Sequence, residues 1–455
     1  MNTTNGSAER TRPHDWFGDR QTIRPRGLRP RQIRDLVRYY MADTHLMPTS
    51  VLPLSPIVIP RRSYAEVFRA GRVLLDLLRR TVLGLAPTLR GRLDGLGTSA
   101  ADYPLVVGDP FVEEEFAAAM ARPDVIIGAD GPRFIEFNPC GTPGGVIETH
   151  SWLRAWRAAY HRYGTAPFRS SDPVHARADF VADACDRLGV EPRAAWVTSM
   201  RDLPSRIAVK YFHLELERLH HRGISAELFT PEDLPHGLMD GDRLAFPIGV
   251  RCFTVPEWRE LGIDIEPVRQ ALDAGCLLLP TQTCGLLDNK KALGLLSEGQ
   301  PWMSAAERAF VERYVPWTRI VADRAVDWRG ERVDLVKHLE AGQRAMVLKR
   351  GIGMKGEAVL VGRGCTAATW RRALDEAVRL GDSVAQEYVE PVACEVDLSW
   401  SDNDAGVVET YPVLGPFLFG DRPGGLWARF LTEGNEGVFT RSVYGSCENV
   451  VVAAA

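Results

Sequence analysis

Residues 121–149 read ARPDVIIGADGPRFIEFNPCGTPGGVIET, and this stretch decides the fold that we expect for the chain. An apolar, β-branched run follows Asp124, a turn of Ala-Asp-Gly-Pro interrupts it, and segment 133–138 then alternates polar and apolar residues. This pattern predicts two strands joined by a tight turn. Because side chains two apart in a strand share a face, we expect Glu136 and Asn138 to point the same way. Ile135 and Phe137 would then lie in the core on the other face.

The polar side chains of this hairpin predict a site for a metal ion. Asp124 lies on the first strand, where the hairpin can bring it opposite Glu136 and Asn138. Carboxylate and amide oxygens gathered on one face suit a hard cation such as Mg²⁺, which also binds phosphate oxygens. The alternative is an ordinary hairpin with a solvated polar face. The glycine-rich turn 139–145 favours the site, because glycine lets the backbone pass close to a ligand.

Length and composition restrict the class of protein. The chain has 455 residues, of which 45% are hydrophobic and 25% are charged, as in an enzyme large enough for more than one core. The formal net charge of −4 argues against a general nucleic-acid binder. We expect neither a signal peptide nor a membrane-spanning helix, which makes the cytoplasm the expected location. The eight cysteines form no C-x-x-C pair, so neither a cysteine zinc site nor a disulfide framework is expected.

Two motifs in the hairpin resemble those of a known family. Arg122-x-Asp124, followed by Glu136-x-Asn138 and the glycine turn, is similar to the magnesium-binding end of the ATP-grasp ligases. The glutathionylspermidine synthases and their circularly permuted ATP-grasp relatives are the branch that it resembles in particular. The resemblance implies that Asp124, Glu136 and Asn138 hold Mg²⁺, as two ions. It also implies that Arg122 is a catalytic residue that meets the phosphate being transferred.

The resemblance requires a nucleotide site, and later segments supply candidates for it. Lys290 opens a helix that has Asp288 or Asn289 as its N-cap. The free amide groups of a helix start add to the charge of a lysine and attract phosphate. By the resemblance, Lys290 contacts nucleotide phosphate. A plain capped helix with a solvated lysine is the alternative.

A second lysine ends a strand and precedes a glycine loop. Lys349 is followed by Gly351, Gly353 and Gly356, and a strand at 358–361 returns. Such a loop can fold over phosphates with its amides pointing inward, while the lysine neutralises their charge. It is not a Walker loop, because G-x-x-x-x-G-K-S/T is absent. In ATP-grasp proteins a loop of this kind is the lid; a flexible hairpin with a surface lysine is the alternative.

Two further segments complete the resemblance. The strand at 383–390 emerges into a turn, and in the superfamily such a segment contacts adenine and ribose; an ordinary edge strand is the alternative. Near the C-terminus, Arg429 follows a Pro-Gly-Gly turn, which resembles the family segment that ends in an arginine near the reacting phosphate. Arg429 is therefore predicted to be catalytic. The candidates for adenine and ribose contact are Gln386, Glu387 and Val389.

Together these features predict an α/β (α+β) protein with a circularly permuted ATP-grasp fold, because the metal residues precede the lysines. Strands alternate with helices between 172 and 282, which favours a mostly parallel sheet and resembles the pre-ATP-grasp α/β domain. We expect five parts in chain order. These are a flexible N-terminal arm (1–30), a metal-binding core part with N-terminal helices (31–170), the pre-ATP-grasp-like domain (171–285), the nucleotide lid subdomain (286–390) and the C-terminal part of the core (391–455).

The activity that the resemblance implies is ATP-dependent joining of a carboxylate to an amine, with release of ADP and phosphate. A carboxylate and an amine do not condense in neutral water, so the acid must first become an acyl phosphate. The expected partners are ATP, Mg²⁺, a small-molecule or peptide carboxylate and an amine, without nucleic acid or membrane; a homodimer is left open. An ATP-grasp kinase and a non-catalytic nucleotide-binding regulatory module are the alternatives. Cys140 is expected to be a small buried residue rather than a nucleophile.

Overall fold

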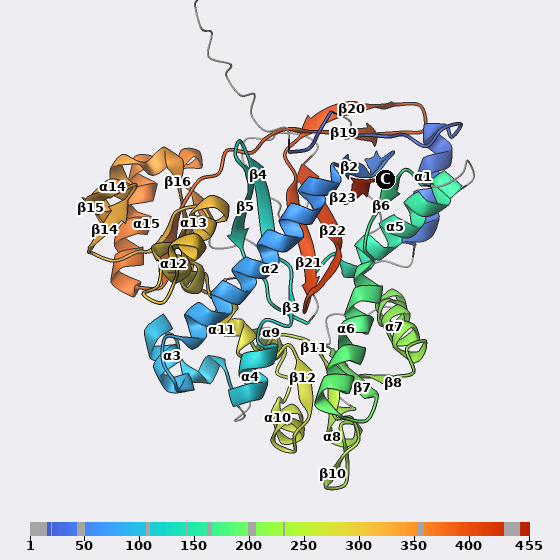
Figure 1. Cartoon of the computed structure of the whole chain (residues 1–455), viewed down its shortest axis with the longest axis horizontal. Coiled ribbons are helices and arrows are strands. Elements are labelled where there is room, and N and C mark those ends of the chain that lie inside the picture. Colours follow the sequence, from blue (N-terminus) through green and yellow to red (C-terminus); the bar gives the residue numbers. More distant parts are fainter. Residues whose placement is uncertain are drawn as a thin grey trace, which may run out of the picture.

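The structure is a computed structural model of the whole chain (Figure 1). It describes residues 16–19, 21–42, 51–105, 110–141, 143–161, 166–198, 206–230, 233–353, 359–431 and 446–455. These residues form a mixed α/β arrangement built on several sheets. Within this described part, no helix is both long and apolar enough to cross a membrane.

The central sheet joins strands from both ends of the chain. Its strand order is β2-β23-β22-β21-β4-β5, so the C-terminal strands lie between the N-terminal strand β2 and the hairpin β4–β5 (Figure 1). All neighbouring strands are antiparallel except β2 and β23. The bounds are β2 Ile57–Ile59, β4 Asp124–Gly128, β5 Gly131–Glu136, β21 Val413–Phe419, β22 Arg422–Leu431 and β23 Ser446–Ala454, with β3 (Met120–Ala121) beside β21 and β6 (Phe168–Arg169) beside β23.

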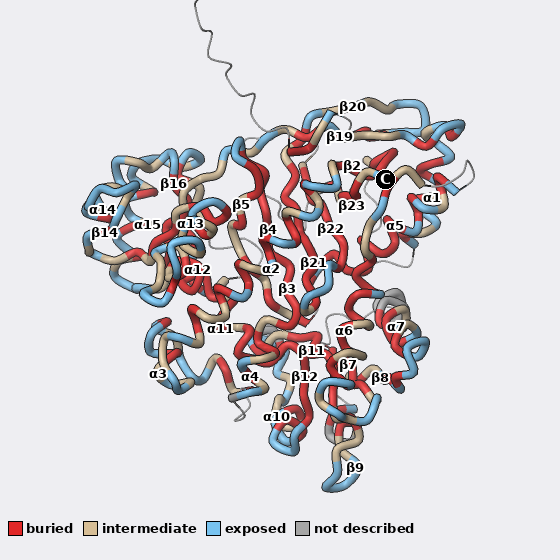
Figure 2. The backbone as a smooth tube through the Cα atoms, in the orientation of Figure 1, coloured by how far each residue is buried: buried red, intermediate tan, exposed pale blue. Residues whose placement is uncertain are grey.

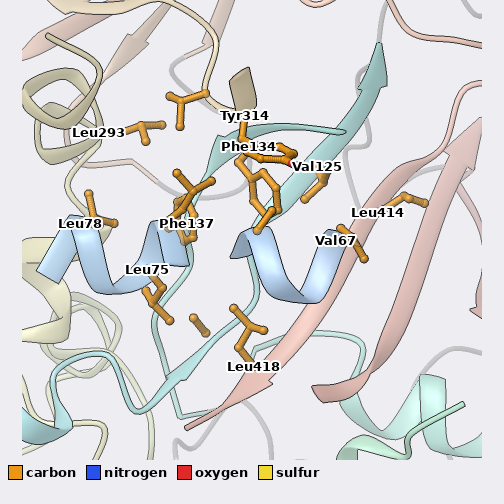
Figure 3. Packing of buried hydrophobic residues seen from close by; sticks show 14 of the residues in the cluster. Val67, Leu75, Leu78, Val125, Phe134, Phe137, Leu293, Tyr314, Leu414 and Leu418 are labelled. Atoms are coloured by element: carbon orange, nitrogen blue, oxygen red, sulfur yellow. The ribbon is translucent and has the colours of Figure 1, made fainter. Parts of the chain in front are cut away.

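Helix α2 (Arg61–Leu83) covers one face of this sheet and forms the main core with it (Figure 3). Its apolar stripe packs on alternate residues of the strands, since alternate side chains of a strand share a face. Full burial of one such Leu or Phe contributes roughly 1.5–3 kcal/mol. The residues labelled in Figure 3 are Val67, Leu75, Leu78, Val125, Phe134, Phe137, Leu293, Tyr314, Leu414 and Leu418.

The predicted hairpin is confirmed, but a β-bulge changes which side chains enter the core. Asp124 pairs with Glu136 and Val125 pairs with Phe134, so Ile135 is the extra residue. A bulge shifts the alternation of side chains beyond it. Phe134 and Phe137, three residues apart, therefore both lie in the core, with ring centroids 5.8 Å apart. The expectation that Ile135 anchors the core is wrong, because the bulge leaves its side chain half-buried.

A second sheet has strand order β12-β11-β7-β8 and is parallel throughout. This confirms the parallel sheet predicted between 172 and 282. It lies beyond the β3 end of the central sheet, with helices of the same segment around it (Figure 1). Its strands are β7 Arg193–Thr198, β8 Ser225–Phe229, β11 Ile248–Cys252 and β12 Leu277–Leu279, accompanied by α6 Pro173–Leu188, α7 Arg206–His220, α8 Leu234–Gly237, α9 Val255–Glu260, α10 Glu266–Asp273 and the short pair β9 Met239–Asp240 and β10 Arg243–Leu244.

A third sheet, antiparallel and of strand order β13-β18-β16-β17, carries the second lysine. It lies on the β5 side of the central sheet (Figure 1). The strands are β13 Thr318–Ile320, β16 Met346–Arg350, β17 Val359–Val361 and β18 Ser383–Glu387; around them lie α11 Cys284–Asp288, α12 Lys290–Glu298, α13 Ala305–Tyr314, α14 Leu335–Ala341, α15 Ala367–Leu380 and the pair β14 Ala325–Trp328 and β15 Glu331–Asp334.

The remaining elements close the ends of the molecule. Most residues of the central strands are buried, whereas buried and exposed residues alternate along the outer helices (Figure 2). A small sheet of order β1-β19-β20 lies near α1 and α5 (Figure 1). The bounds are α1 Pro30–Met41, α3 Leu89–Leu96, α4 Pro110–Phe116, α5 Val146–His161, β1 Leu52–Pro53, β19 Cys394–Ser399 and β20 Ala405–Thr410.

The described part of the expected N-terminal arm is packed rather than flexible. Trp16 and Phe17 are buried, and the indole of Trp16 donates to Glu66 at 3.2 Å. The Arg24 guanidinium donates to both oxygens of Asp397, at 2.6 and 2.7 Å. The stretch is mostly polar, which favoured a loose arm, but its two aromatic residues Trp16 and Phe17 pack into the core. The prediction of a flexible arm is therefore wrong for the described residues between 16 and 30.

Candidate functional site

The face of the central sheet away from α2 carries the predicted polar residues. Val125 and Leu414 point into the α2 core, so the residues that alternate with them point to the other face. Arg429 pairs with Val413 on one side and with Glu448 on the other, so its side chain lies on that second face. Asp124 precedes Val125 in β4, so its side chain lies on the same face as that of Arg429.

Asp124 lies between two arginines. Its Oδ1 accepts a hydrogen bond from Arg122 at 3.1 Å, and its Oδ2 accepts one from Arg429 at 3.0 Å. Burial, the largest influence, acts to raise the pKa of Asp124, yet the charges of Arg429 and Arg122 hold it below its ordinary value. Both guanidinium groups also lie over the ring of Trp427, at 4.7 Å for Arg429 and 5.2 Å for Arg122. The carboxylate is therefore ionised and fixed in place.

Asn138 lies just beyond β5 and is bound to the backbone of Arg122. Its Nδ2 donates to the Arg122 carbonyl at 3.0 Å, and the Arg122 amide donates to the Asn138 carbonyl at 3.0 Å. A carbonyl oxygen can only accept, so the amide nitrogen must face Arg122 and Oδ1 must face away. Register places Asp124 directly across from Glu136. The structure thus brings Asp124 and Glu136 together and leaves the Asn138 amide oxygen turned away from the backbone.

Lys290 begins α12 and reaches the hairpin. Asn289 is the N-cap, because its side chain accepts from the Lys291 amide at 3.0 Å, which confirms one of the two predicted caps. The Lys290 ammonium lies 3.1 Å from Glu136 Oε1 and donates to the Gly353 carbonyl at 3.1 Å. Lys290 therefore connects the start of α12 with the glycine loop and with the carboxylate of Glu136, which was predicted to be a metal ligand.

Lys349 is buried at the end of β16 and contacts the bulge. Its ammonium donates to the Ile135 carbonyl at 3.0 Å and to Gln386 Oε1 at 2.8 Å. Gln386 in turn donates to Thr318 Oγ1 at 3.0 Å. Burial lowers the pKa of Lys349 to about 8, although the nearby carboxylate of Glu136 acts to raise it. This lysine is therefore close to its titration point at neutral pH and would gain from a phosphate beside it.

The start of the glycine loop is held against α12. The Gly351 amide donates to the Asp382 carbonyl at 2.6 Å, and its carbonyl accepts from the Lys290 amide at 2.9 Å. A Cβ at this position would lie 2.8 Å from Asn289 Oδ1, which explains the need for glycine. Gly353 contacts Lys290 as described above. Gly356 and the first residue of the predicted returning strand lie outside the described residues.

The three candidates for adenine contact lie along one stretch of chain in different surroundings. Gln386 is buried and bound to Lys349, so its side chain orients that lysine. Glu387 Oε1 accepts from Arg329 at 2.7 Å, and its amide donates to the Trp317 carbonyl at 2.8 Å. Val389 lies against the hairpin turn, 3.3 Å from where a Cβ on Gly128 would be.

Two carboxyl groups near the site, Asp288 and Glu448, were given no place in the site from the sequence. Burial raises the pKa of Asp288 to about 7, with Glu136 adding to the rise and Lys290 opposing it. Burial and the neighbouring carboxylate of Glu148 raise the pKa of Glu448 to about 8. Trp427 Nε1 donates to Glu448 Oε2 at 3.3 Å. Asp288 adjoins the predicted Asn-Lys motif, which was a usable signal, whereas Glu448 becomes visible only through its cross-strand pairing with Arg429.

The turn after the hairpin packs on the same tryptophan. Gly145 has φ +94°, and a Cβ there would lie 2.4 Å from the Trp427 ring, so the backbone rests directly on the indole. Burial raises the pKa of Cys140 to about 11, which leaves its thiol protonated. The Cys140 side chain is half-buried rather than buried, and its protonated thiol agrees with the expectation that it is not a nucleophile.

The residues present fit Mg²⁺ with a bound phosphate group. Two carboxylates and an amide oxygen provide the hard oxygen ligands that Mg²⁺ prefers. Within the described part of the chain, the buried Nε atoms of Arg122 and Arg429 have no hydrogen-bond partner. Buried donors of this kind are costly unless a ligand or water satisfies them, and a phosphate oxygen would do so.

Comparison with known proteins gives a likeness in fold at low sequence identity. No protein-family model and no curated protein matches the chain. Among solved structures, a glutathione synthetase-like effector from Globodera pallida, in its apo form, is 12% identical with a TM-score of 0.57, over 93% of this chain and 96% of that one. A protein from Methylobacillus flagellatus KT, provisionally named a gamma-glutamylcysteine synthetase, is 13% identical with a TM-score of 0.40, over 80% and 83% of the two chains. The first match shows that this chain shares the fold of a glutathione synthetase-like protein.

Proposed function

We propose that the chain is an ATP-dependent carboxylate–amine ligase of the ATP-grasp class, which forms an amide through an acyl phosphate and releases ADP. The observation that carries this proposal is the meeting of six charged side chains from four separate segments around the hairpin β4–β5 of the central sheet. Three are from the first segment and one from each of the others: Arg122, Asp124, Glu136, Lys290, Lys349 and Arg429.

The order of these residues supports a circularly permuted form of the fold. The hairpin that carries Asp124 and Glu136 precedes both lysines in the chain, whereas β21 and β22 return to the same sheet from the C-terminal end. The motifs resemble those of the glutathionylspermidine synthase branch. The division proposed with it is a core part at 31–170, a pre-ATP-grasp-like domain at 171–285, a nucleotide subdomain at 286–390 and the rest of the core at 391–455.

The proposed chemistry assigns each charged group a task. Asp124, Glu136 and Asn138 would hold Mg²⁺, which when bound neutralises the β- and γ-phosphates of ATP. Arg122 and Arg429 would stabilise charge on the γ-phosphoryl group as it moves to the substrate carboxylate. Asp124 already orients both guanidinium groups, so this alignment exists before the nucleotide arrives.

The two lysines would complete nucleotide binding from the other side. Lys290 would exchange its contact with Glu136 for a phosphate oxygen, which frees that carboxylate for the metal. Lys349 would gain a full positive charge beside the phosphates. Gly351 and Gly353, with Gly356, would form the lid that keeps water from the acyl phosphate. Gln386 would orient Lys349, while Glu387 and Val389 remain candidates for contact with adenine and ribose.

An amine would then attack the acyl carbon, forming the C–N bond and releasing phosphate. The acid and the amine are proposed only as classes: a small-molecule or peptide carboxylate and an amine. An ATP-grasp kinase would share the site but would leave the phosphoryl group on its product. A regulatory nucleotide-binding module would bind ATP without turnover.

The test is product analysis with hydroxylamine, which converts acyl phosphates into hydroxamates. Wild type, Glu136→Gln and the surface control Glu395→Gln are incubated with ATP, Mg²⁺, hydroxylamine and a panel of amino acids and peptides. The proposal expects acid-dependent hydroxamate, ADP and free phosphate from wild type and Glu395→Gln, and a large loss in Glu136→Gln. A phosphorylated product without free phosphate would favour the kinase. Bound ATP that is never consumed with any acid would favour the regulatory module.

A further inference from the structure

A second group of metal-ligating side chains lies apart from the charged cluster, where α5 meets α6. His150 is in the second turn of α5, Asp172 is the N-cap of α6, and His175 is in the first turn of α6. One ligand atom from each side chain lies within 4.8 Å of one from each of the others. The cluster therefore joins three groups that the proposed reaction does not use.

Two of these side chains are fixed before any ligand binds. His150 Nδ1 lies 3.0 and 2.9 Å from the two oxygens of Asp172. Asp172 Oδ1 also accepts from the Val174 amide at 3.1 Å, which caps α6 and holds the carboxylate in place. His150 is 8% exposed and Asp172 is 6% exposed. A buried pair held in this way pays little conformational entropy on binding an ion.

His175 is the residue that a purely structural role leaves unexplained. Its ring centroid lies 5.9 Å from that of His150. The Asp172 carboxylate already bonds to His150, so the pair does not need His175 as a partner. Among the described residues, the ring nitrogens of His175 have no hydrogen-bond partner. The side chain is exposed, so it gives solvent and ions access to the buried pair.

We propose that His150, Asp172 and His175 form a site for one divalent transition-metal ion of the zinc class. Imidazole nitrogen with a carboxylate is the ligand set that suits Zn²⁺, and it differs from the all-oxygen set that suits Mg²⁺. Three protein ligands with one exposed member leave a coordination position for water. The site joins the start of α5, which follows the turn on Trp427, to the start of α6.

Arg157 decides between the metal site and a simple ion pair. Its guanidinium lies 3.8 Å from Asp172 Oδ2, and its side chain is 45% exposed. In a purely structural cluster this arginine is a favourable partner for the carboxylate. In a metal site it repels the incoming cation, and its exposure lets it move away into solvent. Removing this charge should therefore tighten metal binding.

The test is zinc uptake by the full-length protein after treatment with EDTA, measured by equilibrium dialysis, with Co²⁺ absorption as a report on ligand geometry. The variants are His175→Ala, Arg157→Met, the exposed α5 control His161→Ala, and Glu136→Gln, which separates this site from the proposed magnesium site. We expect wild type and His161→Ala to bind one more ion than His175→Ala, or to bind it at least about tenfold more tightly.

Arg157→Met is expected to bind this ion about fivefold more tightly than wild type, since a neighbouring positive charge is gone. Glu136→Gln is expected to retain it, so a failure of the proposed ligase activity would leave this result unaffected. Equal zinc affinity and stoichiometry in wild type and His175→Ala would overturn the proposal. So would zinc binding that weakens in Arg157→Met.

Discussion

Asp124 and Arg429 lie 305 residues apart in the sequence and are joined by a hydrogen bond of 3.0 Å. The bond exists because β21 lies between β4 and β22 in the central sheet, which aligns the two ends of the chain on one face. Asp124 also accepts from Arg122, so one carboxylate orients both arginines that the proposed reaction uses.

The Asp124–Arg429 pair is expected to contribute more to the free energy of unfolding than an exposed ion pair of the same strand. Arg429→Gln removes a buried charged hydrogen bond and should lower the free energy of unfolding by about 2 kcal/mol. Arg422, also in β22, contacts Asp183 at 2.9 Å in an exposed setting, so Arg422→Gln should cost less than about 1 kcal/mol. Urea unfolding of both variants measures the difference, and equal costs would contradict the buried role of Arg429.

Lys349 predicts a pH dependence of nucleotide affinity. Its pKa is lowered to about 8 by burial, against an ordinary value of 10.5. Between about pH 8 and pH 10.5 this lysine is protonated in the unfolded chain but not in the folded protein. The free energy of unfolding of the free protein therefore rises with pH in this range. Phosphate favours the protonated amine, so ADP affinity should fall as pH rises above about 8, by up to about tenfold per unit.

Calorimetric titration of ADP between about pH 7 and about pH 9.5 checks this expectation. Lys349→Arg is the control, because arginine stays charged across the range and should give a flat profile. Burial acts to lower the pKa of Lys290, but the charges of Glu136 and Asp288 raise it above its ordinary value. Lys290 therefore does not titrate in this pH range. The same fall in affinity in Lys349→Arg would show that another group is responsible.

The sequence predicted the local elements around these residues and missed their surroundings. The hairpin, the cap at Asn289 and the parallel sheet were all readable, because each depends on a short pattern of neighbouring residues. The bulge at Ile135 was not, since it depends on how β4 and β5 align. It decides that Phe134 enters the core and that the Ile135 carbonyl meets Lys349.

The place of Glu448 beside the site could not be predicted from the sequence for a related reason. Glu448 lies in an apolar C-terminal strand that carries no motif, and only the pairing of β22 with β23 places it beside Arg429. The roles of the predicted site residues likewise remain predictions, although the structure brings the charged ones together. The packed residues Trp16 and Phe17 show the same limit, because their partners are distant in the chain.

Gly145 is predicted to be essential for the turn that covers Trp427. Both its φ of +94° and the indole 2.4 Å from a would-be Cβ oppose a side chain. Gly145→Ala should lower the free energy of unfolding by about 3 kcal/mol or more, from strain and overpacking together. Gly189, at φ +61° with nothing near its Cβ position, is the matched control and should cost only about 1–2 kcal/mol. Chemical denaturation distinguishes them, and equal losses would mean that contact with Trp427 is unimportant.

Glu448 is predicted to destabilise the folded protein increasingly as the pH rises from 4.5 to about 8. Burial and Glu148 raise its pKa to about 8 from 4.5, so the folded state holds a proton that the unfolded state releases. Stability should therefore decline as pH rises between those two values. Glu448→Gln keeps an acceptor for Trp427 and should raise the free energy of unfolding by about 1–2 kcal/mol at about pH 8, with little change at about pH 4. A pH-independent effect in urea unfolding would contradict this assignment.

The central claim, that Asp124, Glu136 and the lysines form a magnesium–nucleotide site, is tested most directly by thermal unfolding with ADP, with and without Mg²⁺. The variants are wild type, Glu136→Gln and Glu395→Gln as an exposed control. At about a hundredfold excess over Kd, binding should stabilise wild type by about 2.7 kcal/mol, or a few degrees in Tm. The account predicts a magnesium-dependent rise in wild type and Glu395→Gln that is lost in Glu136→Gln. An ADP response that is absent in all three proteins, or equal in all three with and without Mg²⁺, would contradict it.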